Sequence, residues 1–126
     1  MPGQGHRRRR GRRAVRMLEP ALLLLLHHCP AHGYTLLEQL GEFGLDGLNP
    51  SVIYRVLRDM EARGWVTSSW DEEQTQGPPR RVYCLTVLGD EVLAQWARDL
   101  EEGKRKIDYL LGAYHRHMEE GEGEHH

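Results

Sequence analysis

The clearest periodic pattern of apolar and polar residues lies between residues 48 and 63. Apolar side chains recur there at the spacing of one helical face, and polar side chains take the opposite face. The apolar positions are Val52, Ile53, Val56, Leu57 and Met60, and the polar ones are Ser51, Tyr54, Arg55, Arg58 and Asp59. Asn49 precedes the pattern as an N-cap would, and Gly64 stands where a helix-ending glycine belongs. The sequence therefore predicts an amphipathic helix with a polar, partly basic outer face.

Two strand-like runs follow this helix, Trp65–Trp70 and Arg81–Leu85. A polar loop that carries glycine and proline separates them, so we expect a β-hairpin. A helix followed by a hairpin is the core of a winged helix-turn-helix domain. In such a domain the helix fits the DNA major groove, and the hairpin can lie along the backbone beside it.

Two further helices are expected upstream. Residues from about Val15 to His28 are apolar almost all round, which is typical of a helix buried between other elements, and Leu22 is expected also to touch a second subunit. Pro20 is tolerated only in a first turn, so the regular helix is expected to begin near Glu19. A second amphipathic helix is expected over His32–Phe43. Its apolar side is expected to contain Tyr34, Leu37 and Leu40, with Leu36 beside them.

A long helix with a heptad pattern is expected after the hairpin. Thr86 is placed to cap it with its hydroxyl, and Gly89 falls in the first turn. Seam positions alternate at spacings of four and three residues, at Trp96, Leu100, Gly103, Ile107, Leu110, Tyr114 and His117. One small domain cannot bury so long a seam, so we expect a second copy of the chain to cover it. The expected interface residues on this helix are Leu100, Ile107, Leu110 and Tyr114. An intramolecular amphipathic helix is the alternative.

Charge separates a basic arm from an acidic body. The 126 residues carry a formal net charge of −2, but residues 1–16 hold seven arginines and no acid, and all 19 acidic residues follow. Such an arm is expected to be disordered and to reach for polyanions, with Arg12 and Arg13 as candidate DNA contacts. A solvated tail is the alternative.

Other chemistry is weakly indicated. Three histidines and a cysteine lie close together, namely His27, His28, Cys29 and His32. Their spacing fits no common zinc pattern, so we favour a helix end followed by a turn and expect no metal or cofactor. Cys29 and Cys84 are too few for a disulfide framework, and Cys29 has no resolving partner near it in sequence. The apolar run Ala21–Leu26 is far shorter than the ~20 residues that span a bilayer, so no membrane association is expected.

Four blocks of sequence match one known family in order. They are His32-Gly33-Tyr34, Leu48–Glu61, Gly64-Trp65-Val66 and Gly77–Thr86. They resemble the PadR family of bacterial transcription regulators, and the resemblance as a whole covers about residues 17–96. The C-terminal region is similar to the subgroup with a single long terminal helix. The resemblance implies a winged-helix DNA-binding domain, a homodimer, and repression of nearby genes.

Carried onto this chain, the resemblance also implies candidate site residues. The DNA-binding candidates are Ser51, Tyr54, Arg55 and Arg58 on the recognition helix, and Arg80 and Arg81 on the wing. A packing role for the tyrosine, and solvated surface positions for the arginines, are the alternatives. In some relatives an aromatic residue of the last helix faces its symmetry mate and sandwiches flat ligands, which makes Trp96 a ligand candidate. With Trp65, Trp70 and Tyr114 it could build an aromatic pocket, although a core position in the seam is the alternative.

The expected fold is mainly α with a small β-hairpin: a winged helix-turn-helix domain plus a long C-terminal dimerisation helix. The expected parts are a disordered arginine-rich arm (1–14), the DNA-binding domain (15–85), the dimerisation helix (86–118) and a disordered tail (119–126). No phosphate loop, nucleophile elbow or paired His/Glu motif indicates an enzyme. We expect a cytoplasmic dimeric regulator of double-stranded DNA. It would be a repressor on a pseudo-palindromic operator, relieved by a stress signal or by a small hydrophobic or aromatic effector. A winged-helix interaction module without sequence-specific DNA binding is the alternative.

Overall fold

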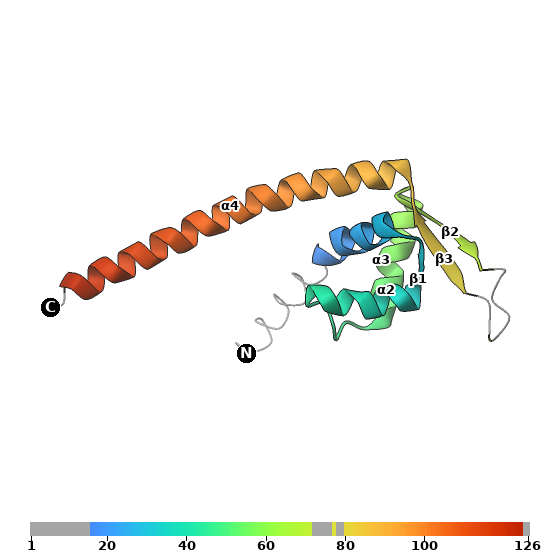
Figure 1. Cartoon of the computed structure of the whole chain (residues 1–126), viewed down its shortest axis with the longest axis horizontal. Coiled ribbons are helices and arrows are strands. Elements are labelled where there is room, and N and C mark those ends of the chain that lie inside the picture. Colours follow the sequence, from blue (N-terminus) through green and yellow to red (C-terminus); the bar gives the residue numbers. More distant parts are fainter. Residues whose placement is uncertain (1–15, 72–76, 78–79, 125–126) are drawn as a thin grey trace. The chain divides into compact units, whose positions relative to one another are not determined.

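The computed structural model describes residues 16–71, 77 and 80–124. Residues 16–28 form a first helix. It is followed by β1 (Ala31–His32), α2 (Gly33–Gln39), the 3₁₀ turn η1 (Leu40–Phe43), α3 (Pro50–Ala62), β2 (Val66–Trp70), β3 (Arg81–Leu85) and α4 (Val87–Glu124) (Figure 1). The chain divides into two compact units, Met1–Leu93 and Ala94–His126, and α4 contributes to both. The predicted arm, with Arg12 and Arg13, lies outside the described residues.

The first helix supplies much of the core of the first unit. Its buried apolar residues are Leu18, Ala21, Leu22, Leu23 and Leu26. Leu22 was predicted at a subunit interface, but it is fully buried in the core of its own chain because it shares a helical face with Leu18 and Leu26. Leu24 of the same helix is 46% exposed.

Pro20 lies inside the first helix. Residues 16–28 are helical, which confirms the helix predicted from about Val15 to His28, whereas the prediction that its regular part begins only near Glu19 is wrong. The N–H that proline lacks would pair with the carbonyl of Arg16, at the N-terminal end of the described helix, so the loss of this one bond interrupts little.

The predicted second helix is present as α2 followed by η1. Leu36 and Leu40 are fully buried, whereas Tyr34 is 57% exposed and does not belong to the apolar side as predicted. Tyr34 precedes Leu36 by two residues, or about 200° around an α-helix, which turns its ring away from the core. The chain then turns toward α3 through Gly44, whose φ of 72° is the left-handed conformation that glycine favours.

Both ends of α3 are capped by the residues that the sequence predicts. The side-chain oxygen of Asn49 accepts the backbone N–H of Ser51 at 3.0 Å, which caps the helix start. At the other end Gly64 has a φ of 81°, and the N–H of Trp65 donates to the carbonyl of Met60 at 2.9 Å. This is the Schellman arrangement, which satisfies carbonyl groups that the helix end leaves open.

The sheet has one strand more than predicted. Its antiparallel order is β1-β3-β2, so β3 is the central strand, with Ala31 of β1 and Ser68 of β2 on either side of Tyr83. The hairpin of β2 and β3 confirms the prediction, with β2 starting at Val66. A strand of two residues such as β1 is too short to show any alternation of apolar and polar side chains, so sequence reasoning missed it.

The long helix α4 has 38 residues, a length of about 57 Å at the usual rise of the α-helix. The hydroxyl of Thr86 accepts the backbone N–H of Gly89 at 3.0 Å, which confirms the predicted cap. The helix continues through residues 119–124, where the sequence analysis expected a disordered tail. This stretch contains no proline and four glutamates, and glutamate is a good helix former.

Candidate nucleic-acid interface

The outer face of α3 carries the predicted recognition residues. Ser51, Tyr54, Arg55 and Arg58 are all exposed, Tyr54 to 41% of its surface. On the opposite face, Ile53, Leu57 and Met60 are at most 2% exposed. The two-faced helix that the sequence predicts is therefore present, with its polar groups directed away from the core.

Tyr54 is held by a close approach to α2. A Cβ added at Gly33, the first residue of α2, would lie only 2.5 Å from the Cε1 atom of the Tyr54 ring. The absence of a side chain at Gly33 thus gives the ring its place beside the start of α2. One edge of the Tyr54 ring therefore packs against Gly33, and the rest of the side chain is exposed. Tyr54 can thus both pack within the domain and present a surface to a partner.

The two wing arginines have different surroundings. Arg81 donates to the hydroxyl of Ser68 at 3.1 Å, and its guanidinium lies 4.9 Å from the ring centre of Trp70. Ser68 in turn donates to the Glu61 carboxylate of α3 at 2.8 Å. Arg81 is thereby fixed on the hairpin, in a network that reaches α3. Arg80 is exposed just before β3 begins.

A pocket of about 370 Å³ joins these elements. The described residues that line this donor-rich pocket are His32, Tyr34, Tyr54, Arg80, Arg81 and Tyr83. They bring hydroxyl, imidazole and guanidinium donors together, and the acidic side chain beside them is that of Asp71, which lies 3.2 Å from His32. Such a set suits an anion with several acceptor oxygens, as a phosphate group is. Sequence reasoning singled out Tyr54 and the arginines but missed the other three residues as site members. The His32-Gly33-Tyr34 block was the signal that could have found two of them.

Two lining residues, Tyr83 and His32, are affected by acidic side chains of neighbouring segments. Burial raises the pKa of Tyr83 above its ordinary value of 10.0, and the nearby Glu61 carboxylate adds to the effect. The Nε2 atom of His32 lies 3.2 Å from the Asp71 carboxylate, which connects β1 to the end of the β2 strand.

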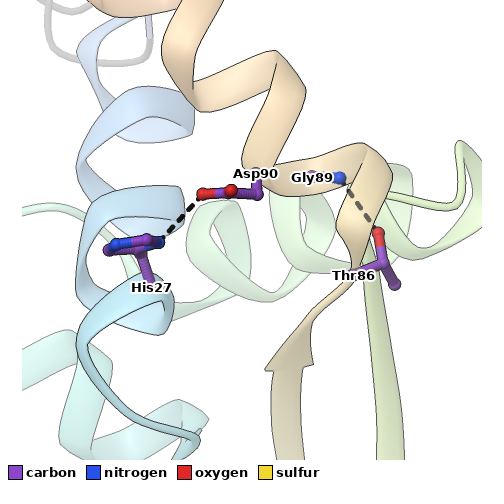
Figure 2. Close-up of polar contacts among 4 residues, drawn as sticks. All are labelled: His27, Thr86, Gly89 and Asp90. Atoms are coloured by element: carbon purple, nitrogen blue, oxygen red, sulfur yellow. Dashed lines mark hydrogen bonds and ion pairs between the residues drawn. The ribbon is translucent and has the colours of Figure 1, made fainter.

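The start of α4 is fixed against the rest of the first unit. The Thr86 hydroxyl lies 2.6 Å from the carbonyl oxygen of Gly64, directly after α3. Gly89 packs so closely that an added Cβ would lie 2.0 Å from the carbonyl oxygen of Trp65. Figure 2 shows the Thr86 hydroxyl and Gly89 together with Asp90, whose carboxylate lies 2.9 Å from Nδ1 of His27 on the first helix.

The predicted seam of α4 is open to solvent in the single chain. Leu100 is 38% exposed, Ile107 57%, Leu110 69% and Tyr114 55%, and Trp96 is half-buried. From Trp96 onward, three more apolar side chains on α4 are also exposed, and they were missed because they fall outside the strict heptad positions: Tyr109, Leu111 and Met118. The apolar surface of this helix is therefore wider than the predicted seam.

Two other residues of the predicted aromatic pocket, Trp65 and Trp70, have partners in the first unit. The ring of Trp65 lies under the Arg63 guanidinium at 5.0 Å, and Trp70 lies under Arg81, so both tryptophans expected in an aromatic pocket have a cationic neighbour.

Within the described ranges, no group of three or more histidine, cysteine or acidic side chains is placed to hold a metal ion. None of the described helices is both long and apolar enough to cross a membrane.

Helices that support a winged hairpin, with a polar face on the third helix, define a winged-helix transcriptional regulator. The PadR-like family of transcriptional regulators matches residues 22–95. The chain is 33% identical over 88 residues to the transcriptional regulator Rv3488 of Mycobacterium tuberculosis, an alignment that covers 68% of this chain and 79% of Rv3488. The chain therefore belongs to the PadR-like family, whose members bind DNA and are not enzymes.

Solved structures agree with this assignment. A PadR family transcriptional regulator from Eggerthella lenta is 28% identical with a TM-score of 0.65, and the match covers 78% of this chain and 80% of that one. TM0937, described as a conserved protein of unknown function and a potential transcriptional factor, is 37% identical with a TM-score of 0.71 over 82% of this chain and 91% of its own.

Proposed function

We propose that this chain is a cytoplasmic, homodimeric repressor that binds a pseudo-palindromic operator and is released by a stress signal or a small-molecule effector. The observation that carries the proposal is the division of α3 into a buried apolar face and an exposed face with a hydroxyl, a phenol and two guanidinium groups. A helix of this kind fits the major groove with its polar face against the base edges.

The proposed contacts differ in what they recognise. Arg55 and Arg58 can each donate two hydrogen bonds to the O6 and N7 atoms of a guanine, which distinguishes that base from the others. Ser51 lies in the first turn of α3, the part of a recognition helix that reaches base edges first. Tyr54 and Arg80 line the donor-rich pocket and suit a backbone phosphate, which fixes the position of the protein without reading sequence.

Two copies of the chain would supply two recognition helices. The exposed apolar residues of α4 support a symmetric interface, because a second copy would remove them from water. Half-sites of the operator would then be related by a dyad and separated by about 34 Å, one turn of DNA, or a multiple of it.

Trp96 supports the proposal of a planar effector. It is half-buried in one chain and lies on the same face of α4 as Leu100 and Ile107. Two copies of its ring, one from each subunit, could sandwich a flat hydrophobic or aromatic molecule by stacking.

The proposal is tested by selecting binding sites from random double-stranded DNA with the full-length protein. A repressor of this kind enriches one sequence with dyad symmetry, and its affinity falls steeply with salt. Enrichment of no sequence, with weak binding to all DNA alike, would instead favour an interaction module that lacks sequence-specific DNA binding.

A further inference from the structure

The two cysteines of the chain meet in one pocket. Cys29 and Cys84 are far apart in the sequence, and both are free thiols in the structure. Together they line a pocket of about 410 Å³. The pocket lies within the first unit, and its other walls come from the end of the first helix, the end of β3 and the first turn of α4. It is separate from the donor-rich pocket beside α3, with which it shares no lining residue.

The pairing of β1 with β3 explains this meeting. Ala31 lies opposite Tyr83. The next residues beyond this pair are Pro30 and Cys84, so the pairing brings the end of the first helix, with Cys29, to the end of β3. A disulfide joins Cα atoms that are ~4.4–6.8 Å apart, so a bond between these cysteines requires the two backbones to approach this closely at the shared pocket.

Both cysteines border the same pocket. Tyr83 is 5% exposed and faces the core, so the alternation of side chains along β3 directs Cys84 to the opposite face. Its partner on β2, Thr67, is exposed there. Cys84 itself is half-buried, and Cys29 is exposed. A small oxidant can therefore reach Cys29 first, with Cys84 available beside it.

We propose that Cys29 and Cys84 are a reversible dithiol–disulfide pair that reacts with peroxides. The Cys29 thiolate attacks one oxygen of hydrogen peroxide, which gives a sulfenic acid and releases hydroxide. The Cys84 thiolate then attacks the Cys29 sulfur, the S–S bond forms, and the sulfenic oxygen leaves as hydroxide. Two thiols are oxidised, and one peroxide is reduced to two molecules of water once both hydroxides take up the thiol protons.

The sequence alone argued against this chemistry because Cys29 has no second cysteine nearby. The fold supplies that partner. The disulfide would join the end of the first helix to the end of β3, beside the contact between His27 and Asp90 that holds the first turn of α4. A covalent link of this kind, which closes a long loop, stabilises the folded chain relative to the unfolded one.

The test uses the full-length protein. Reduced protein is treated with hydrogen peroxide, remaining thiols are alkylated, and the peptides are mapped by mass spectrometry. The expected product is one peptide pair joined through Cys29 and Cys84 within a single chain, reversed by dithiothreitol, together with a higher Tm than that of the reduced protein. Cys29→Ser and Cys84→Ser should each lose both the cross-link and the rise in Tm.

Two results would overturn the proposal. One is peroxide-treated protein in which Cys29 carries a sulfinic acid while Cys84 is still alkylated. The other is a disulfide that joins two chains through Cys29. The exposed position of Cys29 makes Cys29→Ser the variant that retains the fold, so the comparison holds even if Cys84→Ser destabilises β3. None of these readouts involves DNA, so a failure of the proposed repressor function would leave the result for the thiol pair intact.

Discussion

The hydroxyl of Thr86 lies 2.6 Å from the carbonyl oxygen of Gly64 and joins the segment after α3 to the start of α4. The Thr86 hydroxyl oxygen also accepts the N–H of Gly89 at 3.0 Å, and the backbone N–H of Thr86 donates to the carbonyl of Trp65 at 3.1 Å. Any movement of the first turn of α4 must therefore break these bonds or shift the end of α3. In the proposed dimer this junction is the point at which an effector bound on α4 would act on the DNA-binding helix.

Gly89→Ala tests how tight this junction is. The new Cβ would lie 2.0 Å from the Trp65 carbonyl oxygen, a backbone atom that cannot rotate away. We expect the free energy of unfolding to fall by about 3 kcal/mol, the upper part of the usual range for overpacking. Urea denaturation monitored by circular dichroism measures the change.

Gly112→Ala is the matched control for this substitution. Gly112 also lies in α4, but an added Cβ there would meet no atom within 4 Å. In a helix interior this exchange should stabilise the protein by about 0.5–1 kcal/mol. Equal destabilisation by both variants would show that the close approach at Gly89 is not what sets the cost.

Thr86→Val and Thr86→Ser distinguish the contribution of the Thr86 hydroxyl from that of the methyl group. Valine keeps the branched side chain but can neither accept from Gly89 nor donate to the Gly64 carbonyl, so we expect a loss of about 1 kcal/mol of stability. Serine keeps the hydroxyl and should lose much less. The same denaturation measurement decides, and an equal loss for both variants would contradict a role for the hydroxyl.

Gly33→Ala should weaken DNA binding more than it weakens the fold. The new methyl group would lie 2.5 Å from the Tyr54 ring, and a side chain at the surface can move aside at small cost in stability. The displaced phenol would no longer line the donor-rich pocket. We expect a lower operator affinity, measured by fluorescence anisotropy. In a Tyr54→Ala background the added Gly33→Ala should change affinity little, since the two residues act through one contact. Additive losses would refute that coupling.

Ile107→Glu tests the proposed dimer. Ile107 is 57% exposed in the single chain and occupies a seam position, so a charge there would be buried at the proposed interface at high cost. We expect wild-type protein to elute as a dimer in size-exclusion chromatography with light scattering at micromolar concentration, and the variant as a monomer. Lys106→Glu, an exposed position outside the seam, is the control and should remain dimeric. A monomeric wild type would overturn the dimer.

The sequence was most informative where local chemistry determines structure. The caps at Asn49 and Gly64 and the regular spacing of apolar residues between them are short-range signals, so both faces of α3 could be predicted. The hairpin and the Thr86 cap were predictable for the same reason. The order of the family blocks added the assignment of that helix to DNA recognition.

The features missed are those that depend on long-range contacts. The two-residue strand β1 exists because β3 pairs with it, and no pattern in its own residues indicates a strand. Leu22 was assigned to a partner because an almost wholly apolar helix does not show which side its own chain will cover. Tyr34 was assigned to the core although α2 turns it outward. The shared pocket of Cys29 and Cys84 likewise follows from the pairing of distant segments.

Quantitative binding to the selected operator by wild type, Arg55→Ala and Arg58→Ala tests most directly whether the outer face of α3 reads DNA. Arg105→Ala is the control, because this exposed arginine of α4 pairs at the surface with Glu102. The proposed interface predicts that each α3 variant loses about 1–3 kcal/mol of binding free energy and accepts other bases at one position in each half-site, while Arg105→Ala binds as wild type does. Unchanged affinity and sequence preference in both α3 variants would contradict it.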